Sequence, residues 1–233
     1  TGTSSKEEAE VLQDALIKHL ATAGFQLRKW SSSDLSLVER LPDTYRESAD
    51  TRHIESEEYF IKTLGVVWRP KQDIFTFNVK PTDKTPLTKR QILSEVTRIF
   101  DPLGLLSPIV IQLKSFIQAL WLDNLSWDQP LNHNLSQQYN HLSSDLKSIE
   151  EIDIPRFILD KDELSNNPLQ LHCFCDASTT AYAAAVYIRQ PISQGQFRSQ
   201  FLVAKTRVAP IKTLCIHRLE LCAALLRAQL VQS

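Results

Sequence analysis

The sequence predicts an α+β protein, and three observations support this fold class. An amphipathic helical pattern occupies the start of the chain, and two β-rich runs further on flank a turn that contains proline. The last third holds an apolar run that ends in Asp176, two further β-rich runs and a helical pattern that contains Glu220. With 233 residues, 42% of them hydrophobic and 23% charged, the chain has room for one large or two small domains.

The first predicted element is a helix that begins at Ser5 and ends at Gly24. Ser5 followed by Glu8 fits a capping box, apolar residues then recur at helical spacing, and glycine commonly follows a last helical turn. Residues 25–30 are predicted to form a short strand. Residues 31–56 are polar with little periodicity, which predicts a loop.

A hairpin is predicted next. Residues 59–68 and 74–79 are β-rich and flank residues 69–73, a turn that contains proline. A plain structural hairpin accounts for this pattern as well as a functional one does.

Two helices joined by a tight turn are predicted after the hairpin. Thr88 and Gln91 form a second capping box at the start of the first helix. Residues 101–104 (DPLG) form the turn. Ser107 followed by Pro108 then predicts the N-cap and the first position of the second helix.

The rest of the chain is predicted to hold one helix and then a small sheet with a helix. Residues 135–149 are helical within an acidic loop, and Ile154 begins a short strand before the last segment. Residues 171–175 are predicted to be a buried strand that brings Asp176 to the end of a sheet. Further elements are predicted as strands at 181–188 and 200–208 and a helix at 218–226.

The two acids of the last segment are the candidate site. A carboxylate at the end of a strand and another on the next helix, Asp176 and Glu220, can converge on a divalent cation. Oxygen ligands of this kind suit Mg²⁺ or Mn²⁺. Many acidic strand ends and amphipathic helices match the same pattern, so a purely structural role stays open for both residues.

Charge is unevenly distributed along the chain. The formal net charge is −1, so no global basic excess indicates nucleic acid. Residues 60–90 nevertheless carry seven cations and two acids (7 − 2 = +5), whereas residues 145–163 carry three cations and seven acids (3 − 7 = −4). A basic stretch of this kind can follow phosphates, and it can equally be a solvated surface.

The cysteine pattern and the lack of a targeting segment predict an intracellular protein. Cys173, Cys175, Cys215 and Cys222 lack the C-x-x-C spacing of a zinc site and are predicted to be small buried residues of a reduced, intracellular protein. No signal peptide or membrane-spanning run is present. The chain has no methionine, even at position 1, so we expect a processed piece or a fragment of a longer reading frame.

Several strings resemble one family of retroelements. Residues 174–178 (FCDAS), 218–224 (RLELCAA) and 100–104 (FDPLG) are similar to sequences of BEL/Pao retrotransposon polyproteins, in a region also labelled the Pao retrotransposon peptidase family. The resemblance extends over nearly the whole chain. It implies the end of a reverse transcriptase palm with a primer-grip-like hairpin, a helical thumb, a connection, and an incomplete ribonuclease H-like α/β sheet. The corresponding ranges are residues 1–80, 81–130, 131–167 and 168–233.

The resemblance also implies a site and partners. Asp176 would bridge two metal ions and Glu220 would bind one of them, as an incomplete catalytic set that holds Mg²⁺ or Mn²⁺ only if the ribonuclease H site is completed. The expected partners are an RNA–DNA hybrid or primer–template duplex and the rest of the polyprotein, without a membrane, in a cytoplasmic virus-like particle or the nucleus. The residues implied in nucleic-acid binding are Leu64, Gly65, Val66, Trp68, Lys89, Arg90 and Ser178.

The activity of this segment is expected to depend on the rest of the polyprotein. The parent polyprotein would be an RNA-directed DNA polymerase and ribonuclease H, and the fragment would be inactive alone. No Asp-Thr-Gly or Asp-Ser-Gly triplet occurs, which argues against an aspartic peptidase. The alternative hypothesis is a domesticated or degenerate non-catalytic module that binds nucleic acid or another partner. An α+β protein with an unrelated role is the third reading.

Overall fold

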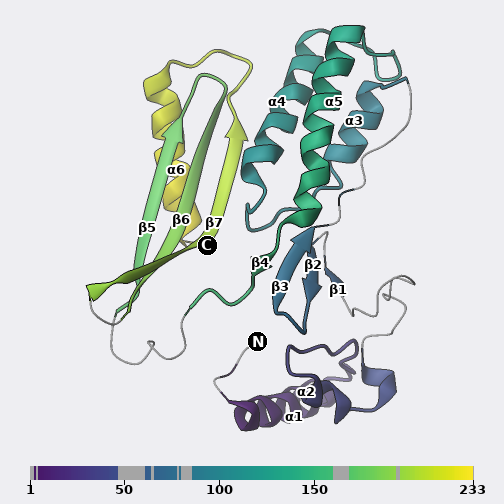
Figure 1. Cartoon of the computed structure of the whole chain (residues 1–233), viewed down its shortest axis with the longest axis vertical. Coiled ribbons are helices and arrows are strands. Elements are labelled where there is room, and N and C mark those ends of the chain that lie inside the picture. Colours follow the sequence, from purple (N-terminus) through teal and green to yellow (C-terminus); the bar gives the residue numbers. More distant parts are fainter. Residues whose placement is uncertain are drawn as a thin grey trace. The chain divides into compact units, whose positions relative to one another are not determined.

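The computed structural model describes residues 3, 5–46, 61–63, 66–77, 79, 86–159, 168–192 and 195–232. It has helices and antiparallel sheets, as the α+β prediction requires (Figure 1). The chain forms two compact units. The first holds the described residues up to Thr63 together with residues 67–76 and 153–156, and the second holds most of the other described residues.

The first unit begins with helix α1 (Lys6–Thr22), whose predicted ends are confirmed. The Ser5 hydroxyl accepts a hydrogen bond from the Glu8 amide at 3.2 Å, and Gly24 has a φ of 79° after the last turn. Two short helices follow, α2 (Leu35–Glu39) and the 3₁₀ helix η1 (Asp43–Tyr45). They lie where a loop was predicted.

The predicted strand at residues 25–30 is wrong. Residues 25–29 have no regular structure, and Trp30 makes only an isolated bridge to Arg46. Lys29 has a φ of 58°, in the left-handed region that an extended strand cannot contain. The short apolar run therefore ends in a local bend, which strand propensity alone does not reveal.

The sheet of the first unit contains the predicted hairpin and one distant strand. Its order is β1 (Ile61–Thr63), β2 (Val66–Arg69), β3 (Ile74–Phe77) and β4 (Ile154–Pro155). Strand β4 pairs antiparallel with β3. The short strand predicted at Ile154 is therefore present, and it completes the hairpin sheet.

An ion pair fixes β4 to the hairpin turn. The Arg156 guanidinium donates two hydrogen bonds to the Asp73 carboxylate, at 2.5 and 3.0 Å. The Trp68 indole N–H donates to the same carboxylate at 3.0 Å. A forked contact of this kind has stricter geometry than a single ion pair, so it sets the register of β3 and β4.

The second unit begins with three α-helices and a 3₁₀ helix, α3 (Lys89–Val96), α4 (Ser107–Leu122), α5 (His133–Ser148) and η3 (Ile149–Glu151). The predicted capping box of Thr88 and Gln91 is confirmed. The side chains at most 1% exposed within these helices form the apolar core: Ile92, Leu113, Leu120, Tyr139, Leu146 and Ile149.

The start of α4 differs from the prediction. Leu106, not Ser107, is the residue before the helix, and it makes no side-chain cap. The Asp101 carboxylate instead accepts hydrogen bonds from the Leu105 and Leu106 amides, both at 2.8 Å. Burial raises the pKa of Asp101, and these backbone hydrogen bonds oppose the rise.

The last sheet has the order β5 (Gln170–Ala177), β6 (Ala181–Pro191) and β7 (Phe197–Val208), all antiparallel, and helix α6 (Ile216–Gln232) packs against β5 and β6 (Figure 1). Strand β5 was predicted to be buried, and this is wrong. It is an edge strand in the described sheet, and Phe174 is 58% exposed. An apolar run does not distinguish a strand covered on both faces from one covered on a single face.

The turn at residues 101–104 docks on this sheet. The Leu103 carbonyl accepts a hydrogen bond from the Ala204 amide of β7 at 2.9 Å. The helices α3–α5 and the sheet β5–β7 therefore belong to one compact unit. The predicted boundaries at residues 81, 131 and 168 stay a prediction. The assignment of palm, thumb and connection stays a prediction.

Candidate functional site

Asp176 is the last residue but one of β5, and its side chain is exposed. Its Oδ1 atom accepts a hydrogen bond from the following amide, that of Ala177, at 2.8 Å. In the sheet, Asp176 lies opposite Ala183, which lies opposite Thr206. Strand β5 thus presents the Asp176 carboxylate near the end of the sheet, as the sequence predicts.

The turn after Asp176 is held by Ser178. The Ser178 amide donates to the Ala181 carbonyl at 2.8 Å, and its hydroxyl accepts from the amides of Thr180 and Ala181 at 3.2 and 3.1 Å. The Thr180 carbonyl accepts from the Ala209 amide at 2.8 Å. The bonds of Ser178 therefore close the turn between β5 and β6, and the bond between Thr180 and Ala209 joins this turn to the residue after β7.

Glu220 lies in the second turn of α6, with its side chain exposed. Its neighbour Leu219 is 1% exposed and packs inward together with Ala223 and Leu226. Helix α6 begins at the end of the sheet where β5 and β7 end (Figure 1). The two predicted acids therefore lie at the same end of this part of the fold.

Asp176 and α6 nevertheless lie on different faces of the sheet. Alternation along β5 places Phe174 and Asp176 on one face and Cys173 and Cys175 on the other. The cysteines lie opposite the buried Val186 and Ala184 of β6, which marks the face covered by α6. The Glu220 side chain could approach Asp176 only by passing the end of β5. Its position in the second turn of α6 is close to the start of that helix.

The four cysteines are not uniformly buried. All are free thiols; Cys215 is exposed and Cys173, Cys175 and Cys222 are half-buried. The prediction of four buried cysteines is therefore wrong for Cys215, which lies directly before α6.

A two-metal site needs more ligands than these two acids. Within the ranges that the structure describes, no group of three or more His, Cys, Asp and Glu side chains is placed to hold a metal ion. Asp176 and Glu220 lie on different elements, and no hydrogen bond joins them in this part of the chain. The residues present do not by themselves fit a two-metal centre.

Lys89 and Arg90 make contacts within the protein. Lys89 is 5% exposed; its ammonium lies 3.9 Å from the centroid of the Trp121 ring and donates to the Leu125 carbonyl at 3.1 Å. The exposed Arg90 pairs with Asp128 at 2.7 and 2.9 Å, which raises the pKa of Arg90. These contacts hold the Lys89 ammonium inside the protein, and the binding of nucleic acid by Lys89 and Arg90 stays a prediction.

The residues predicted for primer contact are only partly described. Leu64 and Gly65 lie outside the described residues. Val66 is half-buried in β2, and the Trp68 indole is engaged by Asp73. The hairpin itself is present, and its contact with a primer stays a prediction.

A basic segment at the end of the chain was not among the predicted features. Residues 168–233 contain seven Lys and Arg residues, and their only acids are Asp176 and Glu220 (7 − 2 = +5). A charge count over this segment alone would have found it. Six of the seven cations are exposed and Arg189 is half-buried; the exposed ones are Arg198, Lys205, Arg207, Lys212, Arg218 and Arg227.

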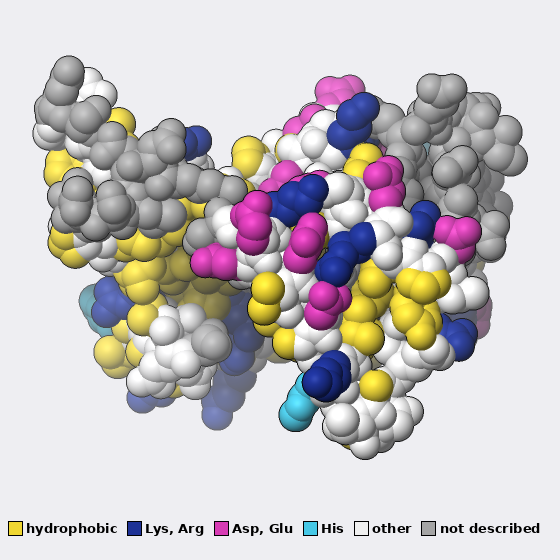
Figure 2. Space-filling view, turned by 90° about the horizontal axis from the view of Figure 1, so that it is seen from below, with side chains coloured by type: hydrophobic (Ala, Val, Ile, Leu, Met, Phe, Trp, Pro, Cys, Tyr) yellow, Lys and Arg dark blue, Asp and Glu magenta, His cyan; other side chains and the backbone are white. Residues whose placement is uncertain are grey.

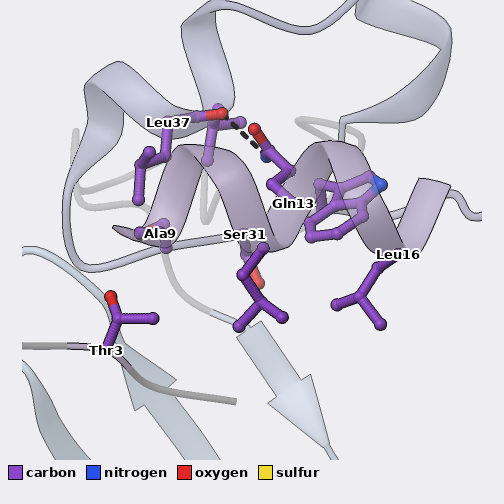
Figure 3. A pocket seen from close by; sticks show the side chains of 10 residues that line it. Thr3, Ala9, Gln13, Leu16, Ser31 and Leu37 are labelled. Atoms are coloured by element: carbon purple, nitrogen blue, oxygen red, sulfur yellow. Dashed lines mark hydrogen bonds between the residues drawn. The ribbon is translucent and has the colours of Figure 1, made fainter. Parts of the chain in front are cut away.

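A small pocket of about 100 Å³ lies in the first unit between α1, α2 and Trp30 (Figure 3). Gln13, 6% exposed, donates to the Leu37 carbonyl at 3.0 Å and accepts from Arg40 at 2.8 Å. The buried Trp30 indole N–H has no hydrogen-bond partner among the described residues. None of the described residues that line this pocket is charged, so the pocket does not indicate a particular ligand.

The fold and the acid at the strand end define the class of protein. A strand ending in aspartate, two antiparallel strands and a helix packed on them agree with a ribonuclease H-like domain. A family model described as the Pao retrotransposon-like RNaseH-like domain matches residues 88–233. The match covers more than half of the chain, so the chain belongs to this family, as the quoted strings predicted.

The other comparisons add no relative. Neither the curated proteins nor the solved structures gave a match. None of the described helices combines the length and the hydropathy of a membrane span.

Proposed function

We propose that this chain is part of the reverse transcriptase and ribonuclease H region of a retrotransposon polyprotein and that its last segment binds nucleic acid, as an RNA–DNA hybrid or primer–template duplex. Membership of the Pao RNaseH-like family supports the first part. The charge of residues 168–233 carries the second part.

The last segment differs in net charge from the rest of the chain. The segment has a net charge of +5, whereas the remaining residues have 19 cations and 25 acids (19 − 25 = −6). Phosphates attract a surface of excess positive charge through released counterions, which gives affinity without sequence preference. Figure 2 shows Lys and Arg side chains beside hydrophobic ones at the left of the view, where β5–β7 lie.

Lys205 and Arg207 offer the sharpest test of this surface. They are exposed, lie on the same face of β7 and occur at alternate positions. We expect the double variant Lys205→Glu/Arg207→Glu to bind an RNA–DNA hybrid about tenfold more weakly and to lower the salt slope of log K by roughly 2. Fluorescence anisotropy with a labelled hybrid at several salt concentrations measures both quantities.

The matched control changes the same number of charges elsewhere. Lys6 and Lys18 are exposed on α1, so Lys6→Glu/Lys18→Glu alters the net charge equally. It should leave affinity close to that of the unchanged protein. Equal losses in the two double variants would show that binding responds only to net charge and would remove the basis for placing it on β7.

Asp176 and Glu220 are proposed to be two carboxylates of a metal site that further acids of the polyprotein complete. The two acids lie at one end of the sheet, and they are the only acids of a strongly basic segment. Acids with a purely structural role in such a segment would be expected to form ion pairs with its Lys and Arg residues. Bound Mg²⁺ or Mn²⁺ would supply water activation for RNA hydrolysis. This chain contributes the strand end and the helix that present the two carboxylates.

The test of this site uses the reading frame extended in both directions. Asp176→Asn and Glu220→Gln should each reduce cleavage of the RNA strand of a hybrid to background, because neutral amides bind divalent cations poorly. Glu150→Gln, an exposed acid outside the segment, is the control and should retain cleavage. Persistent cleavage in either site variant would refute the assignment.

A degenerate or domesticated binding module is the second candidate function. It is favoured by the observation that the described acids do not themselves form a metal-binding group. It predicts that the extended protein binds hybrids with the same salt dependence and never cleaves them. Cleavage by the unaltered extended protein would exclude it.

A further inference from the structure

A cleft of about 540 Å³ lies within the second unit. The turn at residues 101–104, the start of α4, strand β7 and the last turn of α6 surround it. Helix α4 packs beside β7 there (Figure 1). Apolar side chains form much of its walls, among them Ile99, Val110 and Leu230. The volume is typical of small-molecule sites, in which apolar walls surround a few polar groups.

Two lysines from different elements line this cleft, Lys114 of α4 and Lys205 of β7. Both are exposed, and neither forms an ion pair within the part of the chain that the structure describes. Asp101 is the one acid among the described lining residues, and its carboxylate is engaged by the Leu105 and Leu106 amides. The charges around the cleft therefore sum to +1 (2 − 1), which favours an anion.

The Ser107 hydroxyl adds a polar group that the protein does not use. Ser107 is the first residue of α4, lines the cleft and is only 8% exposed. Its hydroxyl makes no hydrogen bond with the described residues, although most buried polar groups have a partner. The Ser107 and Ile109 amides are already bonded to the Gly104 and Leu106 carbonyls. The hydroxyl, and not the helix backbone, is therefore the donor that this end of α4 offers to a ligand.

The kind of donor favours phosphate among the anions. A lysine ammonium is a compact charge that commonly binds phosphate, and a serine hydroxyl can donate to a phosphate oxygen. None of the described lining residues is an arginine, whose planar fork pairs with a carboxylate. The apolar walls would contact the rest of the ligand.

We propose that this cleft binds a phosphate monoester of about the size of a mononucleotide and that Lys114, Lys205 and Ser107 contact its phosphate. The phosphate belongs either to a free nucleotide or to the end of a nucleic-acid strand, and the cleft recognises the same group in both. The proposal goes beyond the function proposed above, because it does not involve Asp176 or Glu220.

Isothermal titration calorimetry of the whole chain with AMP, adenosine and inorganic phosphate tests the proposal. AMP should bind saturably with a Kd below about 1 mM. Adenosine lacks the phosphate and should not bind, whereas inorganic phosphate makes no contact with the apolar walls and should bind more weakly than AMP. No saturable binding of AMP, or equal binding of AMP and adenosine, would overturn the proposal.

Lys114→Gln locates the binding in the cleft. The variant removes one of the two positive charges and should weaken AMP binding about fivefold or more. Lys18→Gln is the matched control, because Lys18 is an exposed helical lysine on α1, outside the cleft. The control should keep the affinity of the unchanged protein. If both variants weakened AMP binding alike, the site would not be this cleft.

Ser107→Ala distinguishes a ligand contact from a structural role. Because the hydroxyl has no partner in the described protein, its removal should leave the free energy of unfolding undiminished. It should nevertheless weaken AMP binding about threefold or more. A loss of stability with unchanged AMP affinity would overturn the role of Ser107 in the site.

A strand with a 5′ phosphate distinguishes the two sources of the group. If a 5′-phosphorylated oligothymidylate binds more tightly than the unphosphorylated strand, and Lys114→Gln abolishes the difference, the ligand is a strand end. Equal binding of the two strands together with saturable AMP binding identifies a free nucleotide. Both results support the phosphate site. Loss of hybrid binding with AMP binding retained would overturn the proposed nucleic-acid function and leave this site standing.

Discussion

A buried polar pair shows how single residues connect the helices of the second unit. The Tyr139 hydroxyl of α5 donates a short hydrogen bond to the Glu95 carboxylate of α3. Tyr139 is 1% exposed and Glu95 is 7% exposed. Burial and then the contact with Glu95 raise the pKa of Tyr139, so the phenol remains a neutral donor at physiological pH.

Tyr139→Phe tests the weight of this bond. The phenylalanine ring keeps the packing against Phe116, whose centroid lies 5.7 Å away, but the buried carboxylate loses a donor. We expect the free energy of unfolding to fall by ~1–3 kcal/mol. Urea denaturation followed by circular dichroism measures the change.

Tyr45→Phe is the matched control. The Tyr45 hydroxyl accepts an exposed hydrogen bond from Gln26 at 2.8 Å, and water can replace this partner. Its loss should change stability by less than about 0.5 kcal/mol. If Tyr139→Phe proved as mild as this control, the buried pair would contribute no more than a surface contact.

At the scale of elements, the turn at residues 101–104 joins the helices to the sheet. Gly104 has a φ of 71°, and a Cβ atom there would lie 2.0 Å from the Ala204 carbonyl oxygen of β7. Asp101 holds the same turn through the amides that precede α4. Glycine is required both for the backbone angle and for the close approach of two backbones.

Gly104→Ala should therefore destabilise the second unit by about 2–5 kcal/mol, from backbone strain and from the collision with β7 together. Hydrogen exchange would show the loss most clearly at the Ala204 amide, which donates to Leu103. Faster exchange confined to β7 would indicate local undocking of the turn.

Gly195→Ala separates the two causes. Gly195 has a φ of 73°, but nothing lies within 4 Å of the added Cβ atom. It should cost only the backbone strain, ~1–2 kcal/mol. If both substitutions lowered the free energy of unfolding equally, the turn and β7 would be able to move apart at little cost and make room for the added Cβ atom.

At the scale of the whole molecule, the near-neutral total conceals regions of opposite charge. Residues 168–233 have a net charge of +5 and the remainder −6, although that remainder includes the basic stretch at residues 60–90. A separation of this kind guides a polyanion to one part of a protein and repels it from another. The net charge of a chain is therefore a poor guide to whether one of its segments binds nucleic acid.

Local features were predictable because their residues are close in sequence. The caps at Ser5 and Thr88, the stop at Gly24 and the strand that ends in Asp176 each involve neighbours whose spacing is set by helix or strand geometry. The same strings also indicated the family, which the match over residues 88–233 confirmed.

The tertiary structure alone decided which surfaces are covered. Strand β4 joins β3 across about eighty residues, Lys89 is buried against Trp121, and one face of β5 is left open beside Asp176. Each outcome depends on which distant segment packs on a given side chain, and local spacing carries no information about that choice. The sequence therefore determined the elements and the two acids, while packing determined which cations and aromatic rings remain exposed.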